Sequence, residues 1–512
     1  MRWLLLLVLF LGGCAHKEFH LRVLHINDTH SHLEPIEYRL PKIGRVTIGG
    51  YGAIASYVKS LDDDHLLFLH AGDALQGTLY YTLFRGEADA AALNTLGLDA
   101  QTLGNHEFDD GAKALRRFLA RLSYPVVSAN VKGLGLKPYI IKHFGSERVA
   151  IVGLSVDASK ISKPGPTVAF ADYMQRAKEV VQELKLQKIN KIIFLTHLGI
   201  RRDKLLAKEV QDIDLIVGGH SHTLLGDFSD VGLRSYGSYP LKIGKSLIVQ
   251  AWKWGMVVGD IDLWFDERGV IQRFRAHPTI LVHEKQLAQK YKSLTYSGVD
   301  AATQKVIAKY KERVQKLQQT LIGEALQDLW HRRLPCERAP NGEVLTAGSL
   351  IAPLVALSMK EQTGADIAIQ NAGGVRKSIL QGPISVGDVM ELLPFGNTLV
   401  LIRMRGEDII ALLKEQAAKA FFGKRSGAFP YLAGAKIVLD KEVKIEGIDP
   451  AREYLVVTNS FLAQGGAGYR FPKGRDSGYL DSEAMIAYIK RHKVLRAPAP
   501  VVEARCLSGA PR

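Results

Sequence analysis

The stretch LRVLHINDTH, residues 21–30, joins a short apolar run to a cluster of polar side chains. Its first six residues have the Leu, Val and Ile content of a buried strand, and Asn27, Asp28 and His30 follow directly. The same arrangement recurs four times along the chain, each time at the end of an apolar run. The later clusters are Gly72-Asp73, Gly104-Asn105-His106-Glu107-Phe108-Asp109, Thr196-His197 and Gly218-Gly219-His220-Ser221-His222.

Between these clusters, short strands alternate with amphipathic helices, which is typical of an α/β protein with a covered sheet. Helices are predicted at 112–122 and 171–186, where apolar residues recur every three or four positions. Strands are predicted at 21–26, 66–69, 125–128, 149–154, 191–195, 215–217, 246–250 and 257–265. The carboxyl ends of parallel strands lie along one edge of a sheet, so we expect the polar clusters to converge there.

Convergence of these clusters predicts a metal site. His and Asp side chains facing one cleft would repel one another or stay unsatisfied without a cation. A mixture of imidazole and carboxylate ligands favours Zn, Mn or Fe over Ca or Mg. Each cluster alone is more often a surface turn or a hydrogen-bonded pair than a ligand set, so the prediction depends on their combination.

The blocks NDTHSHLEP, AGDALQG, GNHEFDDG, THLG and GGHSHT, in this order and spacing, resemble the calcineurin-like metallophosphoesterases, specifically the two-domain 5′-nucleotidase and UDP-sugar hydrolase family. The resemblance implies a four-layer α/β/β/α catalytic domain followed by a second α/β domain that binds substrate. It also implies two divalent metal ions, of the Zn or Mn type. One ion would be held by Asp28, His30, Asp73 and His222, and the other by Asp73, Asn105, His197 and His220.

A bridging carboxylate, here Asp73, suits a pair of cations that activates water and neutralises phosphoryl oxygens. By the resemblance, His106 contacts a phosphoryl oxygen and Asp109 orients its ring. The alternative for His106 is a structural histidine beside the metal site. Family members often carry Asn or Gln where His222 stands, which is a mild departure of this chain.

The second half of the chain restarts with its own strands, predicted at 366–369, 398–404 and 454–457. A long helix predicted at 299–321 contains no Gly or Pro and few apolar residues, so we expect it to connect two domains, residues 19–298 and 322–506. The alternative is a peripheral helix of the second domain.

By the resemblance, the second domain binds the base and sugar of the substrate. The implied substrate-binding residues are Asn371, Arg376, Phe429 and Phe461. A guanidinium meets phosphate with a fixed fork of donors, and flat rings stack on a nucleobase of any identity. For each phenylalanine alone, core packing is the alternative.

Two departures from the family pattern concern the substrate. Ala467 stands where the family usually has the Asp of Gly-Gly-Asp-Gly, which puts recognition of the ribose hydroxyls in doubt. Arg332, Arg333 and Arg338 are candidates for the remaining substrate arginines, but their spacing does not match the family.

The amino-terminal residues 1–14 predict a signal peptide with a lipobox. Arg2 precedes an apolar run too short to span a bilayer, and Leu11-Gly12-Gly13-Cys14 resembles the segment in which the cysteine is lipidated. Ala15 favours sorting to the outer membrane. We therefore expect an exported protein, lipid-anchored at the periplasmic face of the outer membrane or at the cell surface. The alternative is an ordinary cleaved signal.

The net charge of +15 will attract anions such as phosphorylated substrates or acidic headgroups. Lys and Arg are scattered, so no nucleic acid polymer is expected as a partner. Cys336 and Cys506 could form a disulfide in an oxidising compartment or remain free thiols, and the sequence leaves both open.

Together these features predict a dinuclear metal-dependent phosphate ester hydrolase that acts on nucleoside 5′-monophosphates outside the cytoplasm. Alternatives within the same class are a UDP-sugar hydrolase and a cyclic-nucleotide hydrolase. From a different class, a non-catalytic, nucleotide-binding surface lipoprotein remains an alternative.

Overall fold

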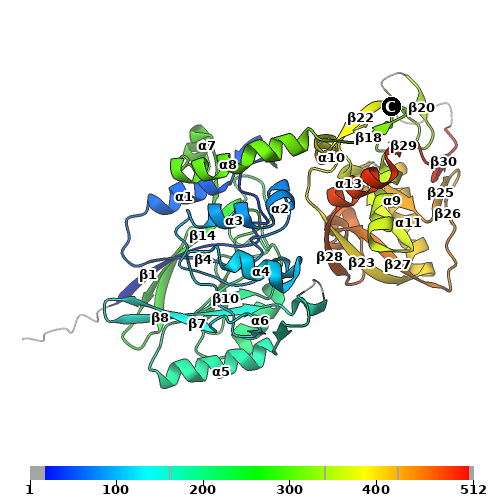
Figure 1. Ribbon diagram of the computed structural model, residues 1–512. Helices are drawn as coiled ribbons and strands as arrows, with labels where there is room; N and C mark the ends of the chain where they lie inside the picture. Colours follow the sequence, from blue (N-terminus) through cyan, green and yellow to red (C-terminus); the bar gives the residue numbers. More distant parts are fainter. Residues whose placement is uncertain (1–17, 161, 163, 340–341, 424–425, 507–512) are drawn as a thin grey trace, which may run out of the picture. The chain divides into compact units, whose positions relative to one another are not determined.

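The computed structural model describes residues 18–160, 162, 164–339, 342–423 and 426–506 (Figure 1). It divides into two compact units. The first comprises the chain up to Gln76, Phe84–Ser159 and Pro164–Ile307, and the second comprises Gly77–Leu83, Lys160–Lys163 and Ala308 onward. Helix α8 (Ala301–Gln318) confirms the helix predicted at 299–321, and the division between the units falls inside it.

The first unit contains two sheets. The first sheet has the order β17-β16-β14-β1-β4-β5, with β15 paired to β14. Strand β1 (Phe19–Ile26) pairs in parallel with β4 (Leu66–His70), which pairs in parallel with β5 (Ala100–Gln101). The remaining strands are β14 (Val257–Phe265), β15 (Ile271–Ala276), β16 (Thr279–Leu281) and β17 (Leu294–Thr295).

The second sheet has the order β12-β13-β11-β10-β8-β7. Its parallel strands are β8 (Glu147–Ser155), β10 (Ile192–His197), β11 (Leu215–Val217) and β13 (Ser246–Val249), and its antiparallel edges are β7 (Tyr139–Phe144) and β12 (Leu241–Ile243). The strand predicted at 125–128 is wrong. Val127 N–H bonds to Gln101 and Ser128 N–H bonds to Lys137, so the segment contacts two different partners and forms no ladder.

The two sheets pack face to face, which corrects the expectation that the polar clusters follow strands of one sheet. Val23 and Leu69 of the first sheet share a buried core with Ile193 and Val217 of the second. Polar residues that follow β1 and β4 lie next to those that follow β10 and β11, and His106, after β5, contacts Asp73. The five clusters therefore meet across two sheets.

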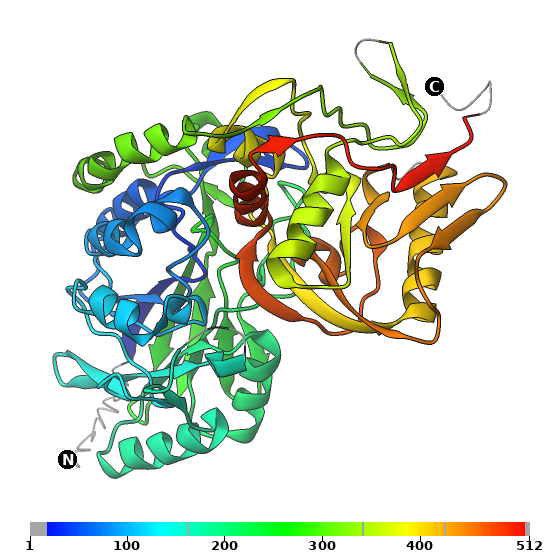
Figure 2. The ribbon, with the colours of Figure 1, turned by 45° about the vertical axis from the view of Figure 1, so that its right-hand side comes forward.

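Helices cover the outer faces and complete four layers. Helix α5 (Tyr173–Leu186) begins where Asp172 accepts a hydrogen bond from Gln175 N at 2.8 Å, and it buries Val180 and Leu184 against the second sheet beside α6 (Ile200–Glu209). Helices α1 (Tyr51–Lys59) and α3 (Glu87–Leu93) lie on the opposite side in both ribbon views (Figures 1 and 2). The α/β/β/α fold implied by the resemblance is confirmed.

The second unit is built on a five-stranded sheet of order β24-β21-β27-β23-β28. Its strands are β21 (Ile367–Asn371), β23 (Thr398–Arg405), β24 (Pro430–Ala433), β27 (Glu453–Asn459) and β28 (Arg475–Leu480). The predictions at 366–369, 398–404 and 454–457 correspond to β21, β23 and β27. Helix α9 (Ala352–Thr363) packs against β21 and β24.

Smaller elements complete both units. In the first they are β2 (Ile36–Leu40), β3 (Gly44–Ile48), α4 (Gly111–Leu119), β6 (Val131–Lys132), β9 (Ala169–Phe170) and α7 (Lys285–Lys290), while α2 (Leu79–Phe84) belongs to the second unit except for Phe84. In the second they are β18 (Leu321–Ala325), β19 (Glu337–Arg338), β20 (Val344–Leu345), β22 (Gly382–Ser385), α10 (Val386–Leu392), α11 (Gly406–Phe421), β25 (Lys436–Leu439), β26 (Val443–Glu446), α12 (Ser460–Ala463), α13 (Asp481–His492), β29 (Val494–Leu495) and β30 (Val502–Ala504).

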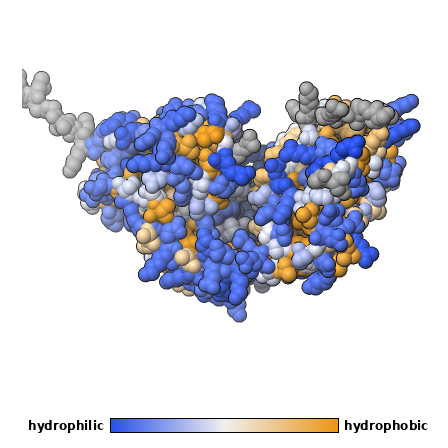
Figure 3. Space-filling view, turned by 90° about the horizontal axis from the view of Figure 1, so that it is seen from above, coloured by the Kyte–Doolittle hydropathy of each residue, from blue (hydrophilic) through white to orange (hydrophobic). Residues whose placement is uncertain are grey.

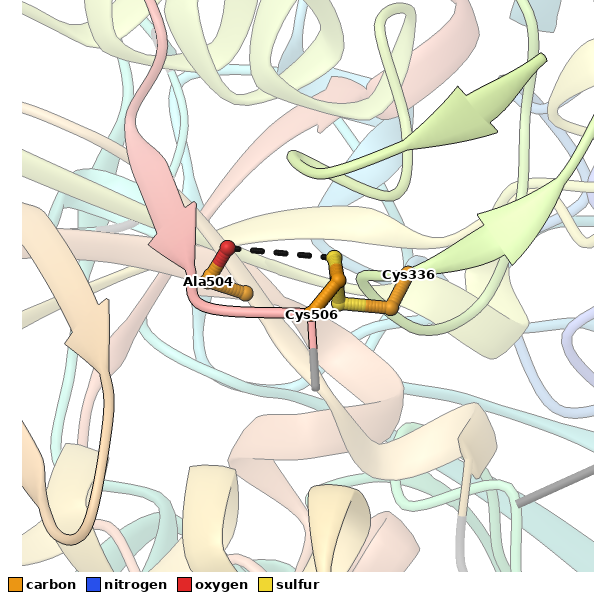
Figure 4. Close-up of a disulfide and its surroundings, with 3 residues drawn as sticks. All are labelled: Cys336, Ala504 and Cys506. Atoms are coloured by element: carbon orange, nitrogen blue, oxygen red, sulfur yellow. Dashed lines mark hydrogen bonds between the residues drawn. A yellow bond between two sulfur atoms is a disulfide. The ribbon is translucent and has the colours of Figure 1, made fainter. Parts of the chain in front are cut away.

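A disulfide joins Cys336 to Cys506, with the two Cα atoms 5.5 Å apart (Figure 4). Cys336 immediately precedes β19, and Cys506 follows β30, where its Sγ lies 3.8 Å from the carbonyl oxygen of Ala504. The bridge settles the alternative that the sequence left open and fits a protein that folds in an oxidising compartment.

Within the described part of the chain, no helix is both long enough and apolar enough to cross a bilayer. The face seen in Figure 3 is mainly hydrophilic, with small hydrophobic areas between. The predicted signal segment and Cys14 fall among residues 1–17, outside the described residues.

Candidate metal centre and substrate site

Loops at the carboxyl ends of five strands bring the predicted metal ligands together. Asp28 and His30 follow β1, Asp73 follows β4 and Asn105 follows β5, while His197 ends β10. His220 and His222 follow β11. Two groups of potential ligand atoms result, each within 4.8 Å: Asp28 with His30 and His222, and Asp73 with His197 and His220.

Asp73 lies close to both groups. Its Oδ2 is 3.0 Å from His197 Nε2 and 3.9 Å from His30 Nε2. In the first group, Asp28 Oδ1 is 3.2 Å from His222 Nε2. A carboxylate placed between two groups of donors fits the bridging role predicted for Asp73.

The protonation pattern of the histidines fits cations at both groups. His197 Nδ1 donates to the carbonyl of Ala71 at 2.7 Å, and His30 Nδ1 donates to the carbonyl of Gln76 at 3.1 Å. In the neutral imidazole, this leaves the lone pair on Nε2, and His30 Nε2 lies only 3.1 Å from His222 Nε2. Lone pairs directed at one another and at carboxylates are stabilised by a cation between them, which a metal ion or, at His197, a proton can supply.

Burial favours the neutral, metal-binding form of two of these histidines. It lowers the pKa of His220 to about 3 and the pKa of His30 well below its usual value. Burial raises the pKa of Asp28, but the adjacent His222 and His197 outweigh it and hold that pKa at about 2. The donors at neutral pH therefore include the carboxylates and the neutral imidazoles of His30 and His220. Burial lowers the pKa of His197, but the carboxylates of Asp73 and Asp28 outweigh it and raise that pKa to about 9, so a bound cation would displace a proton there.

Asn105 supplies a further fit. Its amide oxygen is buried and has no hydrogen-bond partner among the described residues. A buried amide oxygen without a partner costs free energy unless a ligand satisfies it, and metal ligation by Asn would do so.

Most of the ligand residues adopt strained backbone. Asp28, His30, Asp73, His220 and His222 all have positive φ, between 47° and 74°. Left-handed backbone is uncommon outside glycine and concentrates at functional sites, where surrounding contacts hold it. Gly104 shows how tight these contacts are, because a Cβ there would lie 2.0 Å from Asp73 Oδ1.

His106 and Asp109 form a dyad beside these groups. His106 Nδ1 donates to Asp109 Oδ2 at 2.7 Å, and the His106 ring meets the His30 ring edge-on at 5.1 Å between centroids. The backbone N–H of His106 donates to Asp73 Oδ1 at 2.9 Å. This geometry matches the arrangement predicted for the pair.

In the second unit, the predicted substrate-binding residues differ in how far they are exposed to solvent. Asn371 is buried, donates to the carbonyl of Gly427 at 3.1 Å and accepts from Asn459 at 3.0 Å. Phe461 is 48% exposed and Phe429 is 0% exposed, with the Phe429 ring packed edge-on against Tyr431. A fully buried ring has no free face for a base, so the stacking role predicted for Phe429 is corrected to core packing.

Phe395 was missed by the sequence interpretation, whereas Arg333 was among its arginine candidates. Phe395 is 42% exposed, and the guanidinium carbon of Arg376 lies 5.6 Å from its ring centroid. Burial and the nearby Arg333 lower the pKa of Arg376, which places two guanidiniums together. The available signal for Phe395 was an aromatic residue between Pro394 and Gly396, outside any predicted strand.

The side chains of the other two arginine candidates form hydrogen bonds to nearby backbone carbonyls. Arg332 donates to the carbonyl of Arg338 at 2.7 Å, and Arg338 donates to the carbonyl of Gly342 at 2.9 Å. Ala467 has a φ of 55°, a backbone conformation that Asp and Asn tolerate better than Ala.

Comparison with known proteins gives the family. Residues 21–224 match the calcineurin-like phosphoesterase family, and residues 337–474 match the 5′-nucleotidase C-terminal domain. The NAD 5′-nucleotidase of Haemophilus influenzae is 35% identical over 93% of this chain and 91% of its own length. The chain belongs to the 5′-nucleotidase family. A probable 5′-nucleotidase of Treponema pallidum is 34% identical over 96% of this chain and 95% of its own length.

A solved structure of the Haemophilus influenzae NAD nucleotidase superposes with a TM-score of 0.77 at 33% identity, covering 96% of this chain and 100% of that one. As a metallophosphoesterase of this family, the enzyme hydrolyses phosphate esters with two divalent metal ions. When bound, such a pair activates water and neutralises phosphoryl charge. The structure places Asp73 where one carboxylate can serve both ions.

In this member of the 5′-nucleotidase family, Glu107 holds the loops that carry Asp73 and Asn105 in place. Its buried carboxylate accepts backbone N–H bonds from Asp73 at 3.0 Å, Ala74 at 2.7 Å, Leu75 at 3.3 Å and Gly104 at 2.6 Å. Burial and the Asp73 carboxylate raise the pKa of Glu107 to about 7, while the N–H donors oppose them. The sequence interpretation gave Glu107 no role, although it lies within the GNHEFDDG block.

We expect Glu107→Gln to weaken metal binding ~10- to 100-fold, because the amide nitrogen would face N–H donors and the Asp73 loop would shift. Metal competition with a chelator measures this. Glu183→Gln is the matched control, since the Glu183 carboxylate on α5 accepts a hydrogen bond from Tyr139 on the surface, away from the predicted metal ligands. Equal metal affinity in wild type and Glu107→Gln would show that the loop holds its shape without this carboxylate.

Proposed function

We propose that the protein is a 5′-nucleotidase that releases inorganic phosphate from nucleoside 5′-monophosphates. The observation that carries this proposal is the pair of ligand groups around Asp73, with the His106–Asp109 dyad beside them. The ligand groups and the dyad suit hydrolysis of a phosphate ester. The second unit offers exposed aromatic rings and arginine side chains that can bind a nucleotide. Zn and Mn are the ions that best suit the mixed imidazole and carboxylate donors.

His106 acts on the phosphoryl group. Asp109 accepts from Nδ1, which orients the ring and favours its charged form, so Nε2–H can donate to a phosphoryl oxygen as negative charge develops. Asp28, His30, His197, His220, His222 and Asn105 hold the ions together with Asp73.

Phe395 and Phe461 bind the base, and Arg376 with Arg333 binds an anionic part of the substrate. Both rings are partly exposed, and Arg376 contacts Phe395. Phe395 replaces Phe429 in this role. Asn371 stabilises the site through its hydrogen bonds to Gly427 and Asn459.

The second candidate function is hydrolysis of a different phosphate ester. The substrate would be a UDP-sugar, a dinucleotide such as NAD, or a cyclic nucleotide. Ala467 favours the cyclic nucleotide most directly, because a methyl group cannot accept hydrogen bonds from ribose hydroxyls and a cyclic phosphate ester leaves fewer of them free. For the other two it removes one reason to prefer a nucleoside monophosphate. Loss of a hydrogen bond to the ribose is worth roughly 1.5 to 3 kcal/mol and would shift preference among substrates.

We expect the purified protein to release phosphate from AMP only with divalent metal, and a chelator to abolish this. His106→Ala should retain its metal and lose ~100-fold or more in kcat, because the transition state loses a donor. Phosphate release and metal analysis measure both. Chelator-resistant AMP hydrolysis would refute the dinuclear mechanism, and near-normal turnover of His106→Ala would refute the role of that residue.

Phe395→Ala should raise KM for AMP ~5- to 100-fold, because base stacking is lost, and leave KM for ribose 5-phosphate unchanged. Phe429→Ala is the matched comparison: it should lower the free energy of unfolding by ~3 to 5 kcal/mol as a core cavity. Substrate kinetics and denaturation separate the two roles. A Phe395→Ala enzyme with unaltered KM for AMP contradicts the assignment.

We further propose that the protein is exported and held to a membrane by a lipid on Cys14. Cys14→Ser should move the protein from the detergent phase to the aqueous phase in a detergent partition assay, because the acyl chains are lost. Ala15→Gly, which keeps the cysteine, is the control. Unchanged partitioning of Cys14→Ser would rule out the anchor.

A further inference from the structure

A strained turn lies directly beside Asp28. It is formed by Ala251-Trp252-Lys253-Trp254-Gly255, between β13 and β14, and both tryptophans have positive φ, 54° and 60°. Bulky residues rarely adopt this backbone, and it persists only where other contacts hold it. The turn has no place in the metal-ligand set or in the function proposed above.

Three short hydrogen bonds attach this turn to the segment that carries Asp28. Ala251 N donates to Asn27 Oδ1, Asn27 Nδ2 donates to the carbonyl of Trp252, and Trp254 N donates to the carbonyl of Asp28, all at 2.7 Å. The positions of the Trp254 and Lys253 side chains are thereby coupled to the metal centre.

Lys253, Trp254 and His32 form a layered group, which we name the Lys253 platform. The Lys253 ammonium lies 3.7 Å from the centroid of the Trp254 ring, and the same ring stacks on His32 at 4.7 Å with an interplanar angle of 17°. His32 Nδ1 donates to the carbonyl of His30 at 2.9 Å. The platform therefore contacts the backbone of two predicted metal ligands, Asp28 and His30.

Among the described residues, the Lys253 ammonium makes no ion pair within 4.0 Å and no side-chain hydrogen bond, and it contacts the Trp254 ring. Burial lowers the pKa of Lys253 to about 8, opposed by the attraction of Asp28. The Asp28 carboxylate makes its close contacts elsewhere, because its oxygens accept from Asn27 and His220 and face His222. A partly desolvated cation needs a counter-charge from elsewhere.

We propose that Lys253 is a substrate-binding residue that binds a phosphoryl oxygen beside the metal centre. This inference rests on the hydrolase function proposed above and adds a residue to it. An ammonium is a compact point charge suited to phosphate, and the Trp254 ring holds its stem in place. The oxygen belongs either to the transferred phosphoryl group or to a second phosphoryl group next to it.

The competing role is packing, in which the methylene stem of Lys253 covers Trp254 and the charge has no function. Lys253→Met retains most of the apolar stem and removes the charge, while Lys253→Arg retains a charge. Lys290→Met is the matched control, since the Lys290 ammonium lies 5.4 Å from the Tyr291 ring and contacts no predicted metal ligand.

The test is calorimetric titration of inorganic phosphate into the metal-loaded protein, together with KM for AMP and ADP. We expect Lys253→Met to keep its metal content and to lose ~10- to 100-fold in affinity, while Lys253→Arg and Lys290→Met keep most of it. A loss with phosphate and AMP assigns the transferred group. A loss with ADP alone assigns the second phosphoryl group.

Unchanged phosphate affinity and unchanged KM for both nucleotides in Lys253→Met would overturn the proposal. Loss of metal in that variant would also overturn it, since the residue would then serve the metal loops. If the wild-type protein bound phosphate but hydrolysed neither nucleotide, the proposed function would be refuted. The role of Lys253 could still be tested, by comparing the phosphate affinities of the wild type and Lys253→Met.

Discussion

The rest of the first unit depends on keeping two carboxylates, Asp28 and Asp73, buried among histidines. Positive charge has to compensate them, because imidazole nitrogens and carboxylate oxygens lie 3 to 4 Å apart, and although burial lowers the pKa of His197, the two carboxylates raise it to about 9. The fold makes this arrangement possible by supplying backbone donors: His220 N to Asp28 and His106 N to Asp73. The same donors fix the positions at which ions bind.

Two packed sheets provide what one sheet could not. Ligands that follow β1, β4 and β5 approach from one side and those that follow β10 and β11 from the other, so the site is enclosed from two directions. The loops must turn sharply to meet, and the left-handed backbone of five ligand residues is the result. Glu107 and Gly104 show that the surrounding structure is built to hold this strain.

The sequence predicted the polar clusters that the fold brings together because each cluster is local: a polar group that directly follows an apolar run is visible without knowing the fold. It could not predict that the strands belong to two sheets, since strand pairing is a long-range property. The strand expected at 125–128 failed for the same reason, because its donors meet two different segments. Phe429 and Phe395 are alike in the sequence, and only tertiary packing shows that the first is in the core and the second is exposed.

The disulfide between Cys336 and Cys506 has a consequence for the order of folding. The bond joins positions separated by 170 residues, and β29, close to the carboxyl end, pairs with β18 near the beginning of the second unit. A chain is synthesised from its amino end, and domains form as their residues emerge. The first unit can thus assemble early, whereas the second unit closes only after β29 and Cys506 have been synthesised.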